Sequence, residues 1–480
     1  MSIMDRPNVI LITTDQQRYD TLGMTGNVLV HTPHIDALAQ RGTLFERAYL
    51  QNPVCIPSRA CLQTGRYTHQ HGITYNAREI HKTPGLPQWE VTFMERLQLA
   101  GYRTGATGKM HMMPPRGFNY ERLCGGKGYR WTQSQGSPLG PGPLGPTYAS
   151  WLEARHRGGY ELIYEQRRRP EYQEYMTAIS NVLPLEEYVD YWVAEQAIEF
   201  LHYPGPKPFF LWCGFCGPHA PIDPPHPYDK MYPFEEMPLP KSRVDDPQLS
   251  PKGWPHPWWG TDVMKIRRWR SFYLGLVTLI DDMVGRIMSV LDERGLWENT
   301  LIILTSDHGD MAGDYNMMEK GNFYEEIIHV PLIVVPPGSR PAPPRVDGLV
   351  EVFDLAPTIL DYAGVEIPPQ MQASSLRPLV EGHGGPRDCI LCEHTTNDRT
   401  RKGKCLRTPR HKYIFWGAQS APEFYDLQED PDELRNLHND PLYRNLVEWH
   451  KDLLLDRLMQ SERHYFRDET PSPSKLRTWM

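Results

Sequence analysis

The chain has 480 residues, 40% of them hydrophobic and 11% aromatic, which excludes an intrinsically disordered protein and is enough for one large domain and a smaller one. Its net charge of −8 argues against a nucleic-acid partner, and an anionic substrate would need a local cluster of cations to bind. No apolar run approaches the roughly 20 residues of a membrane span, and the N-terminus lacks a signal-peptide pattern, so we expect a cytoplasmic protein with no membrane partner.

Strands and helices are predicted to alternate along the chain. The continuous apolar run at residues 8–15, NVILITTD, predicts a strand buried on both faces, and Pro33 and Gly42 mark the start and end of a helix after it. The apolar runs FFLWCGFCGP and TLIILTSD, at residues 209–218 and 300–307, predict two further buried strands. This order predicts an α/β fold with a large, mostly parallel central sheet flanked by helices.

The chain is predicted to divide into two parts. Residues 1–375 form the main domain, with an insertion at about 112–180 and a proline-rich lid loop at about 217–260. Residues 376–480 form a smaller C-terminal α+β subdomain and a tail, which suggests contacts between subunits of a homo-oligomer. In the subdomain, RDCILCEH and RHKYIFW predict strands, and FYDLQEDPDELRNL predicts a turn into a helix.

Two Cys-x-x-Cys pairs raise the alternative of a zinc or redox site. They are Cys213–Cys216 and Cys389–Cys392, and both lie in apolar runs that read as buried strands. In a strand, residues three apart point to opposite faces, whereas a zinc knuckle needs both thiolates on one side of a turn. We therefore expect structural, reduced cysteines at these positions.

Polar side chains follow three of the predicted buried strands. The first strand ends at Asp15 and Gln16, the second is followed by His219, and the third by Asp307 and His308. In open α/β sheets the ligand crevice lies outside the carboxyl ends of the strands, so these groups are expected to share one edge. An isolated Asp at a strand end is more often a helix cap, but this joint set of oxygen ligands favours a hard divalent cation. Ca²⁺ is expected, with Mn²⁺ as the alternative because of the histidine.

The sequence CIPSRACLQTGR, residues 55–66, resembles the signature of the type I sulfatases, C-x-P-S-R followed by T-G-R. In that family, which has an alkaline phosphatase-like fold, the cysteine is oxidised to formylglycine (3-oxoalanine), whose hydrated aldehyde is the nucleophile. The resemblance implies this modification at Cys55, made by a formylglycine-generating or an anaerobic sulfatase-maturating enzyme. The simpler alternative is a buried cysteine at a helix start.

The resemblance continues through most of the chain. NVILITTDQQRYDTLG and SDHGDMAGDYNMMEKG look like the two metal motifs of the family, and the second contains Lys320. TGKMH resembles the G-K-x-H motif and supplies Lys109 and His111, while GPHAP supplies His219. FYDLQEDPDELRNL resembles the motif that closes the C-terminal subdomain. Residues 112–200 match poorly and are expected to carry specificity.

The resemblance implies a role for each of these residues. Asp15, Gln16, Asp307, His308 and modified Cys55 would hold the metal, and Asp307 would accept the proton of the nucleophile. Lys109, Lys320 and His219 would face the sulfate oxygens, and either His219 or Lys320 would protonate the leaving group. Arg59 would orient the metal ligands. The hydrated aldehyde carries two hydroxyls, of which one attacks the ester, and His111 would deprotonate the other so that sulfate is released. Asn76 and Thr107 are further pocket candidates.

The pattern departs from many sulfatases at both metal motifs, where Asp15-Gln16 and Asp307-His308 replace Asp-Asp and Asp-Asn. Both variants resemble branches that include phosphonate monoester hydrolases and choline sulfatases, whereas Ser58 favours true sulfatases. We therefore predict a sulfuric ester hydrolase of arylsulfatase type that acts on a small-molecule sulfate ester. The alternatives are a phosphonate monoester or phosphodiester hydrolase on the same scaffold, and a non-catalytic metal-binding or thiol protein.

Overall fold

A computed structural model gives the fold of most of the chain. The residues that it describes are 6–76, 85–112, 115–127, 148–241, 262–338, 344–396, 399–417 and 420–462. The proline- and glycine-rich stretch at 134–147, the second half of the predicted lid loop and the C-terminal tail lie outside these residues.

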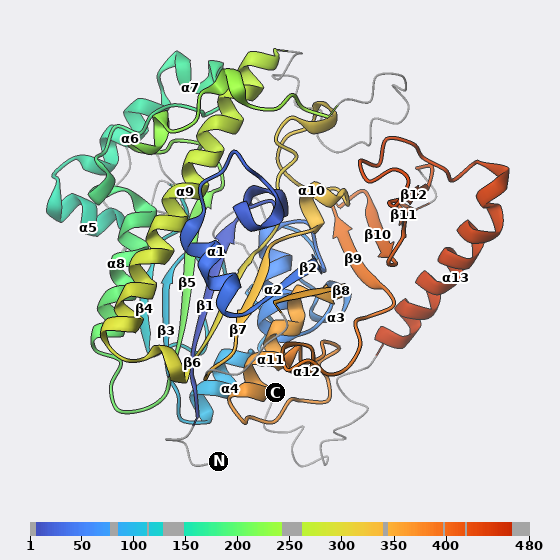
Figure 1. Cartoon of the computed structure of the whole chain (residues 1–480), viewed down its shortest axis with the longest axis horizontal. Helices are drawn as coiled ribbons and strands as arrows, with labels where there is room; N and C mark the ends of the chain where they lie inside the picture. Colours follow the sequence, from blue (N-terminus) through green and yellow to red (C-terminus); the bar gives the residue numbers. More distant parts are fainter. Residues whose placement is uncertain are drawn as a thin grey trace.

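A large sheet of eight strands forms the centre of the molecule, in the order β4-β3-β5-β1-β6-β7-β2-β8 (Figure 1). Strand β7 runs antiparallel to both of its neighbours, and the other strands pair in parallel. The predicted α/β fold with a mostly parallel sheet is therefore confirmed. The strands are β1 (Asn8–Asp15), β2 (Thr43–Tyr49), β3 (Arg103–Gly108), β4 (Tyr120–Leu123), β5 (Phe209–Pro218), β6 (Thr300–Ser306), β7 (Leu332–Val335) and β8 (Arg345–Glu351).

Helices cover both faces of this sheet (Figure 1). Strand β1 shows the division, because Ile10 and Ile12 enter one core cluster while Val9 and Leu11 enter the other. The first cluster is covered by α1 (Pro33–Arg41), α5 (Tyr148–Arg155), α6 (Gly159–Arg167), α8 (Val189–His202) and α9 (Val263–Glu293). The second is covered by α2 (Cys55–Thr64), α4 (Phe93–Leu99), α11 (Leu355–Tyr362) and α12 (Arg377–Val380). The short helices are α3 (Thr68–His71), α7 (Pro170–Glu174) and α10 (Glu325–Ile328).

A small antiparallel sheet follows in the C-terminal region, with the order β12-β11-β10-β9. Its strands are β9 (Ile390–Thr395), β10 (Lys402–Arg407), β11 (His411–Phe415) and β12 (Glu423–Asp426), and the long helix α13 (Arg444–Ser461) packs on one face. The other face packs on residues around α10. The prediction for FYDLQEDPDELRNL is partly wrong, since its first residues continue β12 and the helix begins only at Arg444.

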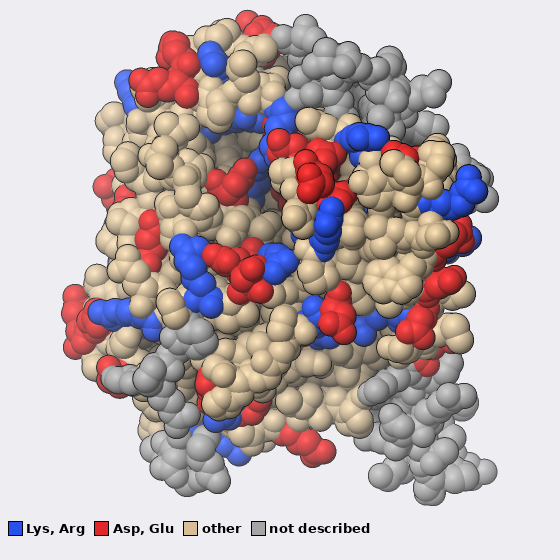
Figure 2. All heavy atoms as spheres, turned by 45° about the vertical axis from the view of Figure 1, so that its right-hand side comes forward, with Lys and Arg blue, Asp and Glu red and all other residues tan. Residues whose placement is uncertain are grey.

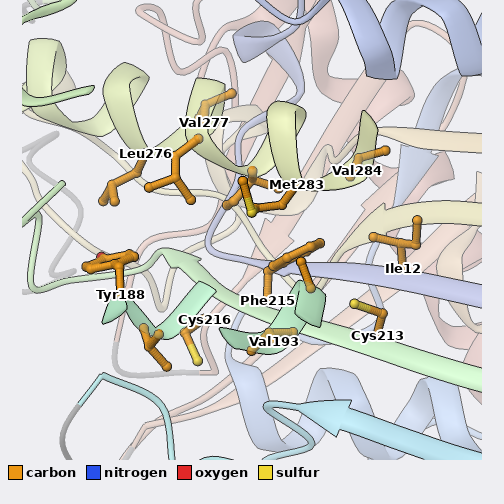
Figure 3. Close-up of a cluster of buried hydrophobic side chains, with 14 of the residues drawn as sticks. Ile12, Tyr188, Val193, Cys213, Phe215, Cys216, Leu276, Val277, Met283 and Val284 are labelled. Atoms are coloured by element: carbon orange, nitrogen blue, oxygen red, sulfur yellow. The ribbon is translucent and has the colours of Figure 1, made fainter. Parts of the chain in front are cut away.

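The two Cys-x-x-Cys pairs differ in geometry. Cys392 lies in one core cluster and Cys389 packs against another, which confirms the predicted opposite faces. The prediction is wrong for the other pair, because Cys213, Phe215 and Cys216 all belong to the cluster between β5, α8 and α9 (Figure 3). The register of β5 against β1 slips beyond residue 214, so Cys216 leaves the strand alternation and its Sγ lies 3.1 Å from Cys124 Sγ. None of these cysteines joins a metal-binding group among the described residues.

The described charged residues are mixed in sign on the face that Figure 2 draws. On the face drawn in Figure 2, lysine, arginine, aspartate and glutamate side chains are interspersed over the part that the structure describes. Among the described helices, none is both long and apolar enough to cross a bilayer.

Asp281 ties α9 to the start of α1 and provides a test of this packing. Its carboxylate accepts the backbone N–H groups of His34, at 3.2 Å, and Ile35, at 2.7 Å. Burial raises the pKa of Asp281 from 3.8 to about 7, so the fold favours the protonated acid and stability falls as the pH rises towards 7. The unfolding free energy of Asp281→Asn minus that of wild type should therefore rise by ~2 kcal/mol as the pH is raised from about 5 to about 8. A difference in chemical denaturation that does not depend on pH would contradict this packing.

Candidate active site

The carboxyl ends of neighbouring strands bring the predicted polar residues together. Strand β1 lies between β5 and β6 and is parallel to both, so Asp15, the residues after Pro218 and the residues after Ser306 meet at one edge of the sheet. The ends are also bonded directly, since the backbone N–H of Gln16 donates to Asp307 Oδ1 at 3.1 Å. The predicted shared edge is therefore present.

Cys55 reaches the same edge from a different strand. Strand β2 is parallel to β8 and ends at Tyr49, and the chain then turns into α2, whose first residue is Cys55. The side chain is 1% exposed, and Sγ lies 3.0 Å from both Lys320 Nζ and His308 Nε2. The first turn of a helix favours negative charge, so this position suits a group that carries an anion.

Two buried cations hold the acidic groups of the site. Arg59 Nε donates to Asp307 Oδ2 at 2.8 Å, and Arg59 Nη2 lies 3.6 Å from Asp15 Oδ2. Lys109 Nζ pairs with Asp15, and the carbonyl of Lys109 accepts from Arg59 Nη1 at 2.8 Å. Arg59 thus fixes both carboxylates and the end of β3 in one arrangement.

Lys320 connects the remaining predicted residues. Its Nζ donates to Gln16 Oε1 at 2.9 Å and lies 2.9 Å from His219 Nε2, while the Gln16 amide donates to Asp310. His111 lies close enough to Cys55 for the two side chains to shift each other's pKa values. All ten predicted site residues therefore lie in one cluster, which consists of Asp15, Gln16, Cys55, Arg59, Lys109, His111, His219, Asp307, His308 and Lys320.

Three further residues lie near the ten predicted site residues: Asn76 and Thr107, which are pocket candidates, and Asp310, which is not predicted from the sequence. Asn76, a pocket candidate, accepts the backbone N–H of Ile56 at 3.0 Å and places Nδ2 3.9 Å from Cys55 Sγ. Thr107, the other candidate, is fully buried within β3 and lies beside Cys213. Asp310 was missed, although it stands three residues after Asp307 in the same motif and accepts the N–H groups of Ala312 and Glu319.

The charges of the site support one another. Burial opposes ionisation of the Cys55 thiol, but Lys320 and His308 outweigh it and hold its pKa well below the usual range. Burial would also raise the pKa of Asp15, and Lys109, His219 and Arg59 instead hold it far below its usual value. The arrangement favours negative charge at residue 55 and at the carboxylate of Asp15.

The residues present fit a divalent cation. Ligand atoms of Asp15, Cys55, Asp307 and His308 all lie within 4.8 Å of one another, and all four residues are buried. Asp15 Oδ1 is buried without a hydrogen-bond donor, which is the state expected of an oxygen that a cation would contact, whereas Oδ2 pairs with Lys109 Nζ.

Comparison with known proteins identifies the family. The family model for Sulfatase matches residues 7–365, and these contain every residue of the cluster. The chain belongs to the sulfatase family. A second model, N-sulphoglucosamine sulphohydrolase C-terminal, matches residues 313–460 of this sulfatase.

Individual relatives cover nearly the whole sulfatase. It is 31% identical to an arylsulfatase of Clostridium perfringens, with 96% of each chain covered. It is 30% identical to the multifunctional alkaline phosphatase superfamily protein PehA of Trinickia caryophylli, over 96% of this chain and 98% of the relative. A solved phosphonate monoester hydrolase of Agrobacterium radiobacter superposes with a TM-score of 0.78 at 25% identity, covering 95% of this chain and 96% of that one. The alkaline phosphatase-like fold is thereby confirmed.

Proposed function

We propose that this sulfatase hydrolyses a sulfate monoester with a nucleophile made from Cys55. The observation that supports this most strongly is the contact of Cys55 Sγ with Lys320 and His308, 3.0 Å from each, beside the paired carboxylates of Asp15 and Asp307. The sulfatase family implies a formylglycine at this position and a divalent metal, for which we propose Ca²⁺ with Mn²⁺ as the alternative. When present, these two groups supply a hydroxyl that is nucleophilic near neutral pH.

The side chains of the cluster supply the rest of the chemistry. Asp15, Gln16, Asp307 and His308 would hold the cation, and Asp307 would accept a proton because one of its carboxylate oxygens lies within 4.8 Å of Cys55 Sγ. Lys109 and Lys320 provide the local positive charge that an anionic ester needs in a protein of net charge −8. His219 Nε2 and Lys320 Nζ are 2.9 Å apart, so one proton held between them can reach the leaving oxygen.

A phosphonate monoester or phosphodiester is the second proposed substrate class. It is favoured by the Gln16 and His308 variants of the metal motifs and by the likeness to a phosphonate monoester hydrolase. The sulfate ester is favoured by Ser58 in the signature and by the arylsulfatase relative. We also propose that a formylglycine-generating or anaerobic sulfatase-maturating enzyme modifies Cys55, that residues 1–375 form the catalytic domain, and that the chain forms homo-oligomers.

A comparison of two substrates tests the proposed class. We expect kcat/KM for 4-nitrophenyl sulfate to exceed that for 4-nitrophenyl phenylphosphonate by about tenfold or more. The leaving group and the single negative charge are the same in both esters, so the ratio reports how the site discriminates the reacting atom and its substituents. The same preparation should be measured on both esters with Ca²⁺ and with Mn²⁺. Faster hydrolysis of the phosphonate under both conditions would favour the second substrate class.

A further inference from the structure

A buried ion cluster joins the small sheet to the segment that carries Lys320. We call Lys412, Glu325 and Glu433 the lysine–glutamate cluster. Lys412 lies in β11 and is 0% exposed, and its Nζ lies 2.7 Å from Glu325 Oε1 and 2.8 Å from Glu433 Oε1. It also donates to the carbonyl oxygen of Phe323 at 2.9 Å. These three acceptors match the three donors of an ammonium group.

The cluster binds backbone as well as side chains. Glu433 Oε2 accepts the backbone N–H of Glu325 at 2.9 Å, at the start of α10. Glu325 Oε2 accepts from the Tyr49 hydroxyl at 2.7 Å, and Arg407 Nε lies 3.5 Å from Glu325 Oε1. Burial raises the pKa of Glu433 to about 7, with Glu325 and Glu326 adding to the rise and Lys412 opposing it. Buried ion clusters add little net stability in general. We therefore look for the role of this one in the backbone that it binds, at Phe323 and Glu325.

Residues 323–325, which the lysine–glutamate cluster binds, lie close in sequence to Lys320 of the active site. Phe323 follows Lys320 by three residues. Gly321 between them has a φ of 103°, which glycine adopts without strain because it lacks a Cβ, and the backbone turns there. Lys320 Nζ contacts Cys55 Sγ at 3.0 Å and Gln16 Oε1 at 2.9 Å. Tyr49, on the other side of the cluster, ends the strand that leads to Cys55. The cluster is thus tied to both partners of the Lys320–Cys55 contact.

We propose that Lys412 and Glu433 are positioning residues for the hydrolysis. They hold residues 323–325 by the Phe323 carbonyl and the Glu325 N–H and side chain, and so direct Lys320 at the reacting group. The small C-terminal sheet thereby acts in catalysis through Lys320, although Lys412, its member of the cluster, contacts Phe323, Glu325 and Glu433 and not the site residues themselves. This inference rests on the role of Lys320 in the proposed function.

A double-mutant cycle tests the proposal. Lys412→Met and Glu433→Gln are each made in the wild type and in Lys320→Ala, and kcat and KM are measured for 4-nitrophenyl sulfate. In the wild-type background we expect kcat to fall by about tenfold and KM to change by less than about threefold. In the Lys320→Ala background we expect a further loss of less than about twofold, because the residue through which both act is gone. Lys412→Arg should restore part of kcat.

The controls separate positioning from folding. Lys404→Met removes a lysine from the neighbouring strand β10, where it pairs with Glu393 and not with residues 323–325, and should leave kcat unchanged. Should Lys412→Met not fold, Glu433→Gln carries the cycle alone, since it keeps the size of the side chain. Equal losses in both backgrounds would overturn the positioning role. Full activity of Lys320→Ala would instead contradict the proposed function of Lys320.

Discussion

Replacement of Cys55 by serine should abolish sustained turnover. A serine oxygen can form an S–O bond to the sulfate while the bond to the leaving group breaks, and the leaving oxygen takes a proton. A sulfated aldehyde hydrate can release sulfate because its second hydroxyl, on the same carbon, becomes the carbonyl of the aldehyde. The resulting serine sulfate has no second hydroxyl on that carbon, so it cannot release sulfate in this way. We expect kcat for Cys55→Ser to fall by more than about 1,000-fold, with a sulfate retained on residue 55 in the mass spectrum.

Cys61→Ser is the matched control for this substitution. Cys61 lies in the same helix and is fully buried, but its Sγ contacts His71 Nε2 at 3.3 Å, away from the ligand cluster. We expect Cys61→Ser to keep its turnover and lose only stability, by about 1 kcal/mol. Multiple rapid turnovers by Cys55→Ser would contradict the proposed nucleophile.

Replacement of Asp307 by asparagine should remove both the cation and the activity. Asp307 contributes one carboxylate oxygen to the metal-binding group, and its Oδ2 accepts from Arg59 Nε at 2.8 Å. An amide can still accept one of these hydrogen bonds, but it leaves the buried guanidinium with one fewer negative charge. We expect metal content to fall well below one equivalent and kcat to fall by about 1,000-fold, with a loss of roughly 3 kcal/mol in stability.

Asp354→Asn separates this effect from general loss of a buried carboxylate. Asp354 is also buried and pairs with an arginine, Arg387, but it lies outside the ligand cluster. We expect it to lose a similar amount of stability and to retain metal and kcat. A fully loaded and active Asp307→Asn enzyme would show that this carboxylate is not a ligand.

Much of the site was predictable because parallel strands place their ends on one edge. The runs that became β1, β5 and β6 were readable as buried strands, so Asp15, His219 and Asp307 could be expected to meet. The signature at Cys55 and Arg59 added the nucleophile, whose strand β2 could not have been placed in the sheet from apolar pattern alone. The short antiparallel strand β7 has only four residues and gave no signal of its direction.

Other features depend on contacts that a single sequence does not encode locally. Cys216 leaves the strand alternation because the register of β5 slips, and a period of two gives no warning of such a slip. The lysine–glutamate cluster joins residues from β11, α10 and the segment after β12. Glu325 and Lys412 are more than eighty residues apart in the sequence. Charged residues of this kind read as solvent-exposed in the sequence, since lysine and glutamate are seldom fully buried.

The nucleophile made from Cys55 is tested by the mass of the peptide that contains residue 55, measured on a preparation of known turnover together with its metal content. We expect an aldehyde in place of the thiol, about one equivalent of a divalent cation per chain, and a turnover that scales with the modified fraction. A preparation with full turnover and an intact cysteine thiol at residue 55 would contradict it.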